Sequence, residues 1–482
     1  MGGQAGRWWW VEEGLACFIS PRRSEQRGAC ILFIFFIPVS ATMPRLPVFI
    51  LGAWATHLTS SGPPRNAVFL CVAALHGALK DARMRATSLD ALVTAPTLAG
   101  GALAGHRLAQ AAGLGLSERR PFPLIRSLDA CGAAGVACLL EARALVQSGA
   151  ASAVAVVLGD AVSSASLPTA AFLERADAAV GGAHGLTPAH PALPSPAIPA
   201  GYDALAAWAL GGGLLARADL AAYASLAALH GSRHPGGLAG KGKQGEERPS
   251  TSDYPHQPPA LSADTILRTG RPVGPATTLF ECARRADGAA AVIVGGADAV
   301  RARGGGGRPP PILIAGGGRA SGPLTPAHPL TAAAWAPLEA AVAGAYAEAR
   351  TGPADVDVWF PYDCYPITAL AALAAMGAVA PRGGGAHAPG GGVPSFGSVA
   401  AGLAAAGRAA SSAAAALVDP GGGPGASSPA AAWPVNTHGG LLGGGAPWAA
   451  PALFSVVEAA VQLRGEAGVG RQVPGARVAV EV

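Results

Sequence analysis

The sequence predicts an α/β protein with a duplicated core, on two observations. Apolar residues make up 50% of the 482 residues and charged residues only 13%, about half of the ~25% usual for soluble domains, so the chain has much to bury. Apolar runs of strand length also alternate twice with Ala- and Leu-rich runs of helix length. This length suits about three domains or one large duplicated one. Because 68 residues are Gly and 42 are Pro, we also expect long loops.

The first round of elements occupies residues 44–303. Strands are expected at 48–52, 89–94, 152–158 and 287–294, and helices at 68–82 and 131–147. The run at 287–294 is rich in Ala, Val and Ile, which is typical of a strand buried on both faces. Between the third and fourth strands we expect an excursion, about 161–285, of mostly loop and short helix.

The second round occupies residues 304–482 and begins with a Gly- and Pro-rich linker. Strands are expected at 312–315, 356–360 and 478–480, and helices at 331–350, 368–376 and 452–464. Residues 381–432 are largely Ala, Gly, Pro and Ser and are predicted to form Gly/Ala-rich loops. Within them, 381–392 and 419–428 are predicted to be flexible.

Residues 1–43 do not share this pattern and form an atypical N-terminal extension. Three consecutive Trp and a basic patch precede an apolar run at 30–37, which is shorter than the ~20 residues needed to span a bilayer. The basic-then-apolar order resembles a targeting signal. The alternative is an unstructured or mis-assigned extension before Met43.

Charge and cysteine content narrow the partners and the compartment. The net charge is +5, with no run of five or six basic residues, so a nucleic-acid partner is not expected and membrane association is not favoured. The seven cysteines are scattered without a Cys-x-x-Cys pair. This spacing predicts no metal site and a reducing intracellular compartment such as the cytoplasm, mitochondrion or peroxisome.

Cys131 is a candidate nucleophile because it lies where the helix at 131–147 should begin. The positive end of a helix dipole stabilises a thiolate and lowers the pKa of the thiol. The alternative is that Cys131 is a small buried apolar residue, as most free cysteines are.

Two later segments add polar groups to apolar surroundings. In 433–448, Asn436 and His438 precede a glycine run in which the backbone N–H groups of Gly439 and Gly440 could stabilise an oxyanion. The alternative is a simple glycine-rich turn. The segment 360–365 ends a predicted strand and contains Cys364, at a position where α/β folds gather site residues.

In this order, the three clusters resemble the thiolase superfamily, most closely the thiolase-like acyltransferases related to the thiolase part of sterol-carrier-protein-x. The most specific match is Asn-Thr-His-Gly-Gly-Leu-Leu at 436–442, and Tyr-Asp-Cys-Tyr at 362–365 is similar to a second family motif. The resemblance implies a five-layered αβαβα fold of two similar halves, with 161–285 as a loop domain covering an acyl-CoA site. It also implies a homodimer or homotetramer that uses the coenzyme A thioester as substrate and needs no further cofactor.

The resemblance also assigns roles to individual residues. Cys131 matches the cysteine that carries the acyl group as a thioester, and Cys364 matches a cysteine offered as acid or base. His438 lies near the site. The histidine of the family's Gly-His-Pro motif falls on Ala446, which removes the general base.

Two hypotheses therefore stand side by side. The first is an acyltransferase with Cys131 as nucleophile and His438 or Cys364 as substitute acid or base. The second is a catalytically impaired protein that binds acyl-CoA or lipid, or serves as a structural partner subunit. For the coenzyme A phosphates the candidate cations are Arg233, Lys241 and Lys243, although a solvated insertion is the preferred interpretation of that stretch.

Overall fold

The computed structural model describes residues 46–99, 103–114, 123–179, 195–238, 261–304, 309–322, 332–378, 406–412 and 433–482. The predictions for residues 1–43, for Lys241 and Lys243, and for 381–432 outside the helical segment 406–412 lie outside the described residues. Leu46–Val482 forms one compact unit. None of the described helices is long and apolar enough to cross a membrane, and the described residues contain no group of His, Cys, Asp and Glu that could hold a metal ion.

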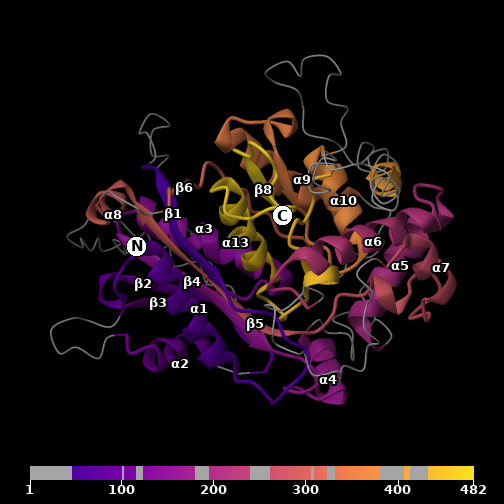
Figure 1. The fold of residues 1–482 in the computed structure, drawn as a ribbon, viewed down its shortest axis with the longest axis horizontal. Coiled ribbons are helices and arrows are strands. Elements are labelled where there is room, and N and C mark those ends of the chain that lie inside the picture. Colours follow the sequence, from indigo (N-terminus) through magenta and orange to yellow (C-terminus); the bar gives the residue numbers. More distant parts are fainter. Residues whose placement is uncertain are drawn as a thin grey trace, which may run out of the picture. The chain divides into compact units, whose positions relative to one another are not determined.

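A six-stranded mixed sheet organises the first half of this unit (Figure 1). Its strands are β1 (Val48–Ala55), β2 (Ala91–Thr94), β3 (Leu124–Ser127), β4 (Ala153–Ala161), β5 (Asp287–Gly296) and β6 (Ile312–Leu313), in the order β3-β2-β4-β5-β1-β6. β2 runs parallel to β3 and β4, whereas β5 pairs antiparallel with both β4 and β1. All nine residues of β4 are buried, as expected for a strand covered on both faces.

Helices cover both faces of this sheet. On one face lie α1 (Ala67–Ala82) and α2 (Ala104–Ala111), and on the other lie α3 (Ala134–Gln147) and α13 (Pro451–Leu463). Side chains of β4 alternate accordingly, with Ala155 on the α1 face and Val156 on the α3 face. Gly52 allows α1 to approach β1 closely, since a Cβ at residue 52 would lie 2.3 Å from the carbonyl oxygen of Ala78.

A second sheet lies on the other side of α13. In the described residues it consists of β7 (Val358–Phe360) parallel to β8 (Ala479–Glu481). Val358 and Phe360 pack with Ala459 of α13, while Trp359 faces the opposite cluster formed with α9 (Ala332–Ala349) and α10 (Pro366–Met376). The layers are therefore helix, sheet, helix, sheet and helix, which confirms the predicted fold class.

The excursion between β4 and β5 holds more helix than the sequence led us to expect. It contains α4 (Thr169–Ala179), α5 (Ala197–Gly211), α6 (Arg217–Arg233) and α7 (Ala263–Thr269), and β5 is followed by α8 (Ala297–Ala302). The prediction of mostly loop and short helix was wrong for α5 and α6. α6 is 17 residues long and buried on several sides, so it lacks the single apolar stripe by which a surface helix is recognised.

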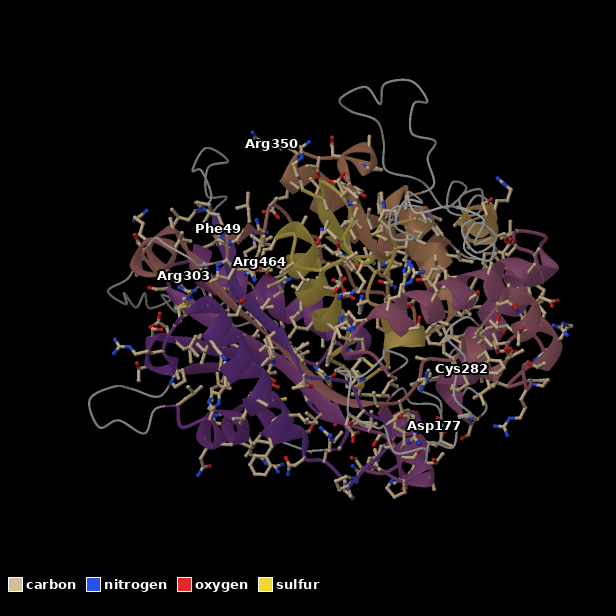
Figure 2. All side chains as sticks on the ribbon, in the orientation of Figure 1. Phe49, Asp177, Cys282, Arg303, Arg350 and Arg464 are labelled. Atoms are coloured by element: carbon tan, nitrogen blue, oxygen red, sulfur yellow. The ribbon has the colours of Figure 1, made fainter. Side chains whose placement is uncertain are left out.

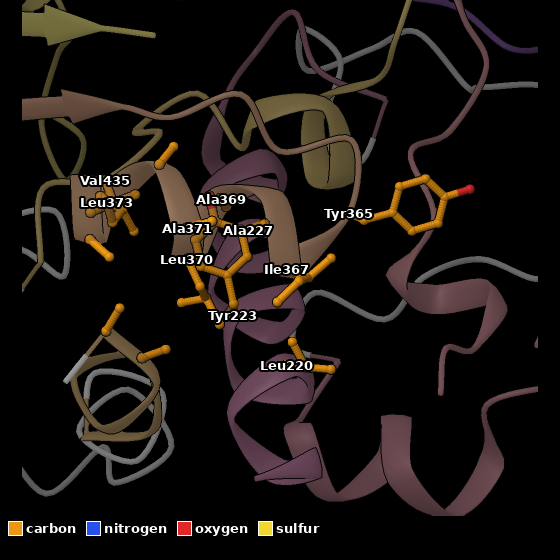
Figure 3. Close-up of a cluster of buried hydrophobic side chains, with 14 of the residues drawn as sticks. Leu220, Tyr223, Ala227, Tyr365, Ile367, Ala369, Leu370, Ala371, Leu373 and Val435 are labelled. Atoms are coloured by element: carbon orange, nitrogen blue, oxygen red, sulfur yellow. The ribbon is translucent and has the colours of Figure 1, made fainter. Parts of the chain in front are cut away.

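The packing of α6 explains why the excursion is held in place. Leu220 and Tyr223 of α6 pack in one core cluster with Ile367 and Leu370 of α10 (Figure 3). On another side, small alanines of α6 pack in a separate cluster with Ile266 of α7. The excursion is thereby anchored to the second half of the unit, beside the loop that connects β7 to α10.

Candidate active site

A cavity of about 2000 Å³ brings the excursion and both halves together. Its wall includes parts of α4, α5, the start of α3 and the loop after β7. Cys131, Cys364 and Ala446 all line it. Asn436, His438, Gly439 and Gly440 do not belong to the lining, so the structure separates the two predicted cysteines from the other predicted site residues.

Cys131 lies in a single 3₁₀ turn, Cys131–Ala133, that leads into α3. Its φ is +45°, a left-handed conformation that side-chain-bearing residues rarely adopt and that clusters at functional sites. Cys131 is an exposed residue on the cavity wall.

The expected low pKa of Cys131 is not found. Although the residue as a whole is exposed, the surrounding cavity wall partly removes its sulfur from water, and this raises the pKa of the thiol above its ordinary value. The backbone N–H of Gly132 lowers the pKa, and the charge of Asp129 raises it. Burial thus outweighs the hydrogen bond from the Gly132 N–H at the start of the helix, and the role of Cys131 as nucleophile stays a prediction.

Cys364 forms one of two neighbouring tyrosine and cysteine pairs in the cavity. Its thiol is hydrogen-bonded to Tyr202 of α5, and the thiol of Cys282 is hydrogen-bonded to Tyr365. The rings of Tyr202 and Tyr365 stack with their centroids 4.8 Å apart. Burial raises the pKa of both thiols to about 12, so both remain protonated at neutral pH.

The figures label both members of the pair formed by Cys282 and Tyr365. Figure 3 shows the ring of Tyr365 directed away from the apolar core around α10. Figure 2 labels Cys282 on the same side of the molecule as Asp177 of α4, and both residues line the cavity.

Tyr362 lies directly against the residue that follows Cys131. A Cβ placed on Gly132 would lie 2.6 Å from both Cζ and the hydroxyl oxygen of Tyr362. Only a glycine at residue 132 leaves room for this ring. Tyr362 also lines the cavity.

Ala446 contributes only a methyl group to the cavity, at a position that its backbone fixes. Its N–H donates to the carbonyl oxygen of Arg284 at 2.7 Å, and its own carbonyl oxygen accepts from the N–H of Ala286 at 3.3 Å. Beyond it, Trp448 meets Phe172 of α4 edge to face at 5.9 Å. The site therefore has no side-chain base at residue 446.

Asn436 and the two glycines after His438 hold the glycine-rich loop in place. The side-chain N–H₂ group of Asn436 donates to Tyr223 at 3.1 Å and to the carbonyl oxygen of Pro361 at 2.9 Å. The N–H of Gly439 donates to the carbonyl oxygen of Asn436 at 2.7 Å. At Gly440, φ is +59° and a Cβ would lie 1.9 Å from the carboxylate of Asp363. An oxyanion role for Asn436, Gly439 and Gly440 stays a prediction.

Asp363 supports this loop from the other side. Its carboxylate is fully buried and accepts from the N–H of Leu441 at 2.7 Å. Burial raises the pKa of Asp363 to about 7, although four hydrogen-bond donors act in the opposite direction. Asp363 thus ties the loop after β7 to the glycine-rich loop.

His438 belongs to a buried polar cluster outside the cavity lining. Glu458 of α13 is the centre of this cluster and accepts from Thr437 at 2.8 Å, from Gln462 at 2.9 Å and from Arg471 at 2.5 Å. Burial raises the pKa of Glu458, but His234 and Arg471 outweigh burial and hold it below its ordinary value. Glu458 is therefore an ionised, fully paired carboxylate.

Two buried histidines near this cluster, His230 and His438, are neutral at physiological pH. Burial lowers the pKa of His438 to about 3 and that of His230 to about 4. His230 Nδ1 lies 2.9 Å from the carbonyl oxygen of Val435, and Nδ1 of His438 has no hydrogen-bond partner within the described part of the chain. The role of His438 as acid or base stays a prediction.

Acidification is expected to destabilise the fold through His230. Its pKa is about 6.5 when unfolded and about 4 when folded, so below pH 6.5 the unfolded chain binds a proton that the folded chain does not. Between pH 7 and pH 5, this difference should lower the free energy of unfolding of the wild type by about 2 kcal/mol. Replacing His230 with Gln should remove this part of the pH dependence. Urea unfolding at both pH values measures it.

His76, which is exposed on α1, provides the matched control for that measurement. Asp363 has a pKa raised to about 7 in the folded state, so acidification stabilises the fold through this residue. Because this contribution is the same in the wild type and in both variants, each variant is compared with the wild type at the same pH. If His230→Gln and His76→Gln show the same pH dependence, the burial argument is wrong.

Among the described residues, the arginines that line the cavity differ from the one described candidate cation, Arg233. Arg233 is not part of the lining, whereas Arg271 and Arg285 are. The guanidinium of Arg285 donates to Ser164 at 2.7 Å and to Thr169 at 2.9 Å, and it lies over the ring of Phe172. Arg285 thus fixes the start of α4 beside the cavity.

Comparisons with known proteins agree with this architecture. Residues 327–418 and 400–482 match the family described as "Thiolase C-terminal domain-like". The chain is similar to the "Ltp2-ChsH2(DUF35) aldolase" structure, with a TM-score of 0.60 at 16% identity over 89% of this chain and 92% of that one. It is also similar to human mitochondrial 3-ketoacyl-CoA thiolase, with a TM-score of 0.57 at 15% identity over 88% of this chain and 94% of that one.

Residues 327–482 thus match a thiolase C-terminal domain family, and the fold of Leu46–Val482 is thiolase-like. A curated relative, sterol carrier protein 2 of Rattus norvegicus, is 28% identical over 221 residues, which are 46% of this chain. The match spans about a third (34%) of the length of that relative. The resemblance predicted from the three sequence clusters is therefore confirmed by the family match of the C-terminal part and by the thiolase-like fold.

Sequence reasoning missed the tyrosines of this thiolase-like site. Tyr202, Tyr362 and Tyr365 all line the cavity beside the cysteines. Tyr362 and Tyr365 flank Asp363 and Cys364 in the motif that the sequence pointed to, so a signal for them was present. Tyr202 comes from α5, whose position could not be predicted.

Proposed function

We propose that this protein is an acyl-CoA acyltransferase of thiolase type that moves an acyl group between coenzyme A thioesters through a thioester on Cys131. The observation that carries the proposal is the placement of Cys131, in a left-handed conformation, on the wall of a cavity of about 2000 Å³ that also holds Cys364. The family match of the C-terminal part and the thiolase-like fold support the same chemistry. The coenzyme A thioester is the substrate, and no separate cofactor is proposed.

In the proposed reaction, Sγ of Cys131 attacks the carbonyl carbon of the thioester. The carbon–sulfur bond to coenzyme A then breaks, the acyl group stays on Cys131, and the thiol proton of Cys131 ends on the sulfur of coenzyme A. A second thiol acceptor reverses these steps. Covalent catalysis of this kind divides one difficult transfer into two easier ones.

Cys364 is proposed as the acid of the site. Burial raises the pKa of its thiol to about 12, so it is protonated before the reaction. It passes this proton to the leaving sulfur of coenzyme A and takes up the proton that Cys131 loses, so that the net transfer is from Cys131 to coenzyme A. This assignment does not require His438, which lies outside the cavity lining.

The second candidate function is binding of acyl-CoA or lipid without turnover, or service as a structural partner subunit. Ala446 favours it, because a methyl group cannot accept the proton of Cys131. The raised pKa of Cys131 points the same way, since the thiolate is the nucleophile.

We also propose that the protein works as a homodimer or homotetramer in a reducing compartment. The match to sterol carrier protein 2 and the fold of the thiolases support this part of the proposal.

The experiment that tests the function is an exchange of label from free coenzyme A into acetyl-CoA. We expect the wild type to catalyse the exchange and Cys131→Ser to fall to the uncatalysed rate, because serine lacks the thiolate. Cys282→Ser is the matched control, since Cys282 lines the same cavity. Binding of acetyl-CoA without exchange in the wild type would support the second candidate function instead.

A further inference from the structure

Tyr362 is a polar residue of the cavity that has no role in the reaction above or in the sequence-based predictions. Its hydroxyl oxygen would lie 2.6 Å from a Cβ built on Gly132, so it sits directly over the residue that follows the nucleophile. Tyr362 lies in the loop that follows β7, directly before Asp363 and Cys364. Its position is therefore fixed by the same hydrogen bonds that hold Asp363.

The hydroxyl of Tyr362 differs from those of the neighbouring tyrosines. The Tyr202 hydroxyl is bound to Cys364, that of Tyr365 to Cys282, and that of Tyr223 to Asp363 and Asn436. Among the described residues, Tyr362 interacts with Cys364, Tyr202, Cys131 and Asp363 through charge alone, and none of them forms a hydrogen bond with its hydroxyl. A donor without a partner, facing a cavity beside a nucleophile, is available to a ligand.

The charge state of this phenol suits a donor. Burial raises the pKa of Tyr362 well above its ordinary value, and the nearby thiols of Cys364 and Cys131 and the hydroxyl of Tyr202 raise it further. The phenol therefore stays protonated at neutral pH. It can donate a hydrogen bond but cannot act as the base for Cys131.

We propose that the hydroxyl of Tyr362 donates the hydrogen bond that stabilises the thioester oxygen while Cys131 is acylated, an inference that rests on the proposed function. As the bond between Sγ and the carbonyl carbon forms, the electron pair of the C=O bond moves onto oxygen, which accepts from the Tyr362 hydroxyl. When the bond to coenzyme A breaks, the C=O bond re-forms and Tyr362 keeps its own proton. Donors placed at a developing oxyanion are usually the largest single contribution to such catalysis.

The test compares two rates on Cys131 in the full-length protein. One is acylation by acetyl-CoA in a single turnover, followed by intact mass, and the other is alkylation by iodoacetamide. Alkylation has no oxyanion, so it reports only the reactivity and exposure of the thiol. The variant is Tyr362→Phe, which removes one hydroxyl from an otherwise unchanged ring.

Tyr346→Phe is the matched control. Tyr346 of α9 lines the same cavity, but its hydroxyl donates to the carbonyl oxygen of Met376 at 2.8 Å. Loss of that hydroxyl removes the same atom without touching residue 132. Thermal unfolding of both variants establishes that they are folded.

We expect Tyr362→Phe to slow acylation by about 10²–10³-fold, to change alkylation less than about 2-fold, and Tyr346→Phe to change neither. Acylation of Tyr362→Phe at the wild-type rate would overturn the inference and leave the proposed function intact. Equal slowing of both rates would also overturn it, because Tyr362 would then act on the thiol itself. A wild type that is not acylated would overturn the proposed function and the inference with it.

Discussion

Replacing Ala446 with histidine is expected to accelerate acylation of Cys131 by about 10²–10⁴-fold, the usual contribution of a positioned general base. Residue 446 lines the cavity that holds Cys131, and backbone hydrogen bonds to Arg284 and Ala286 fix its position. The pKa of the Cys131 thiol is raised by burial, so little thiolate exists without a base. Coenzyme A release from acetyl-CoA in a single turnover measures the effect.

The pH dependence of the acylation rate distinguishes a histidine that acts as a base from one that only changes the packing. In Ala446→His, the acylation rate should rise with pH through an ionisation near the ~6.5 of an ordinary histidine. Ala446→Gln is the matched control, because glutamine has a similar size and does not titrate. If His and Gln change the rate equally, or if neither changes it, residue 446 is not where the base belongs.

Loss of the Glu458 carboxylate is expected to cost about 3–5 kcal/mol of stability, as for other buried ion pairs broken on one side. Glu458 is only 3% exposed and binds Thr437, Gln462 and Arg471. Glu458→Ala leaves the guanidinium of Arg471 buried without its partner. The midpoint of urea unfolding, with an unchanged m-value, measures this loss.

Two further variants test the reason for that loss. Glu466→Ala removes a glutamate that is about half exposed in the same region, and it should change stability by less than about 0.5 kcal/mol. Glu458→Leu combined with Arg471→Met removes both charges and should recover part of the stability. Equal losses for Glu458→Ala and for the double variant would contradict the ion-pair explanation.

The elements with strong local patterns could be predicted from the sequence. β5 is an unbroken Ala, Val and Ile run buried on both faces, and α1 has an Asn66 side chain that accepts from the N–H of Val68 at its start. β3 was missed because it is a four-residue edge strand that contains Arg126 and Ser127, both exposed. A short exposed strand lacks the alternation by which a strand is recognised.

In the candidate site, only residues that belong to a recognisable local motif could be predicted. Cys131 and Cys364 were found because each lies at the end of an element, where α/β folds gather site residues. The direction of the pKa shift of Cys131 could not be predicted, since it depends on burial and on Asp129. The place of His438 depends on α6 and α13, which surround it with His230 and Glu458. Tertiary contacts of this kind carry no local signal in a sequence.

The most direct test of the account is the mass of the intact protein after incubation with acetyl-CoA and, separately, with a long-chain 3-ketoacyl-CoA. The account predicts an adduct with the mass of one acyl group, mapped by peptide digestion to Cys131 and absent from Cys131→Ser. The adduct should disappear when free coenzyme A is added, because the acyl group is transferred back. Absence of an adduct with either thioester, despite measurable binding, would contradict the account.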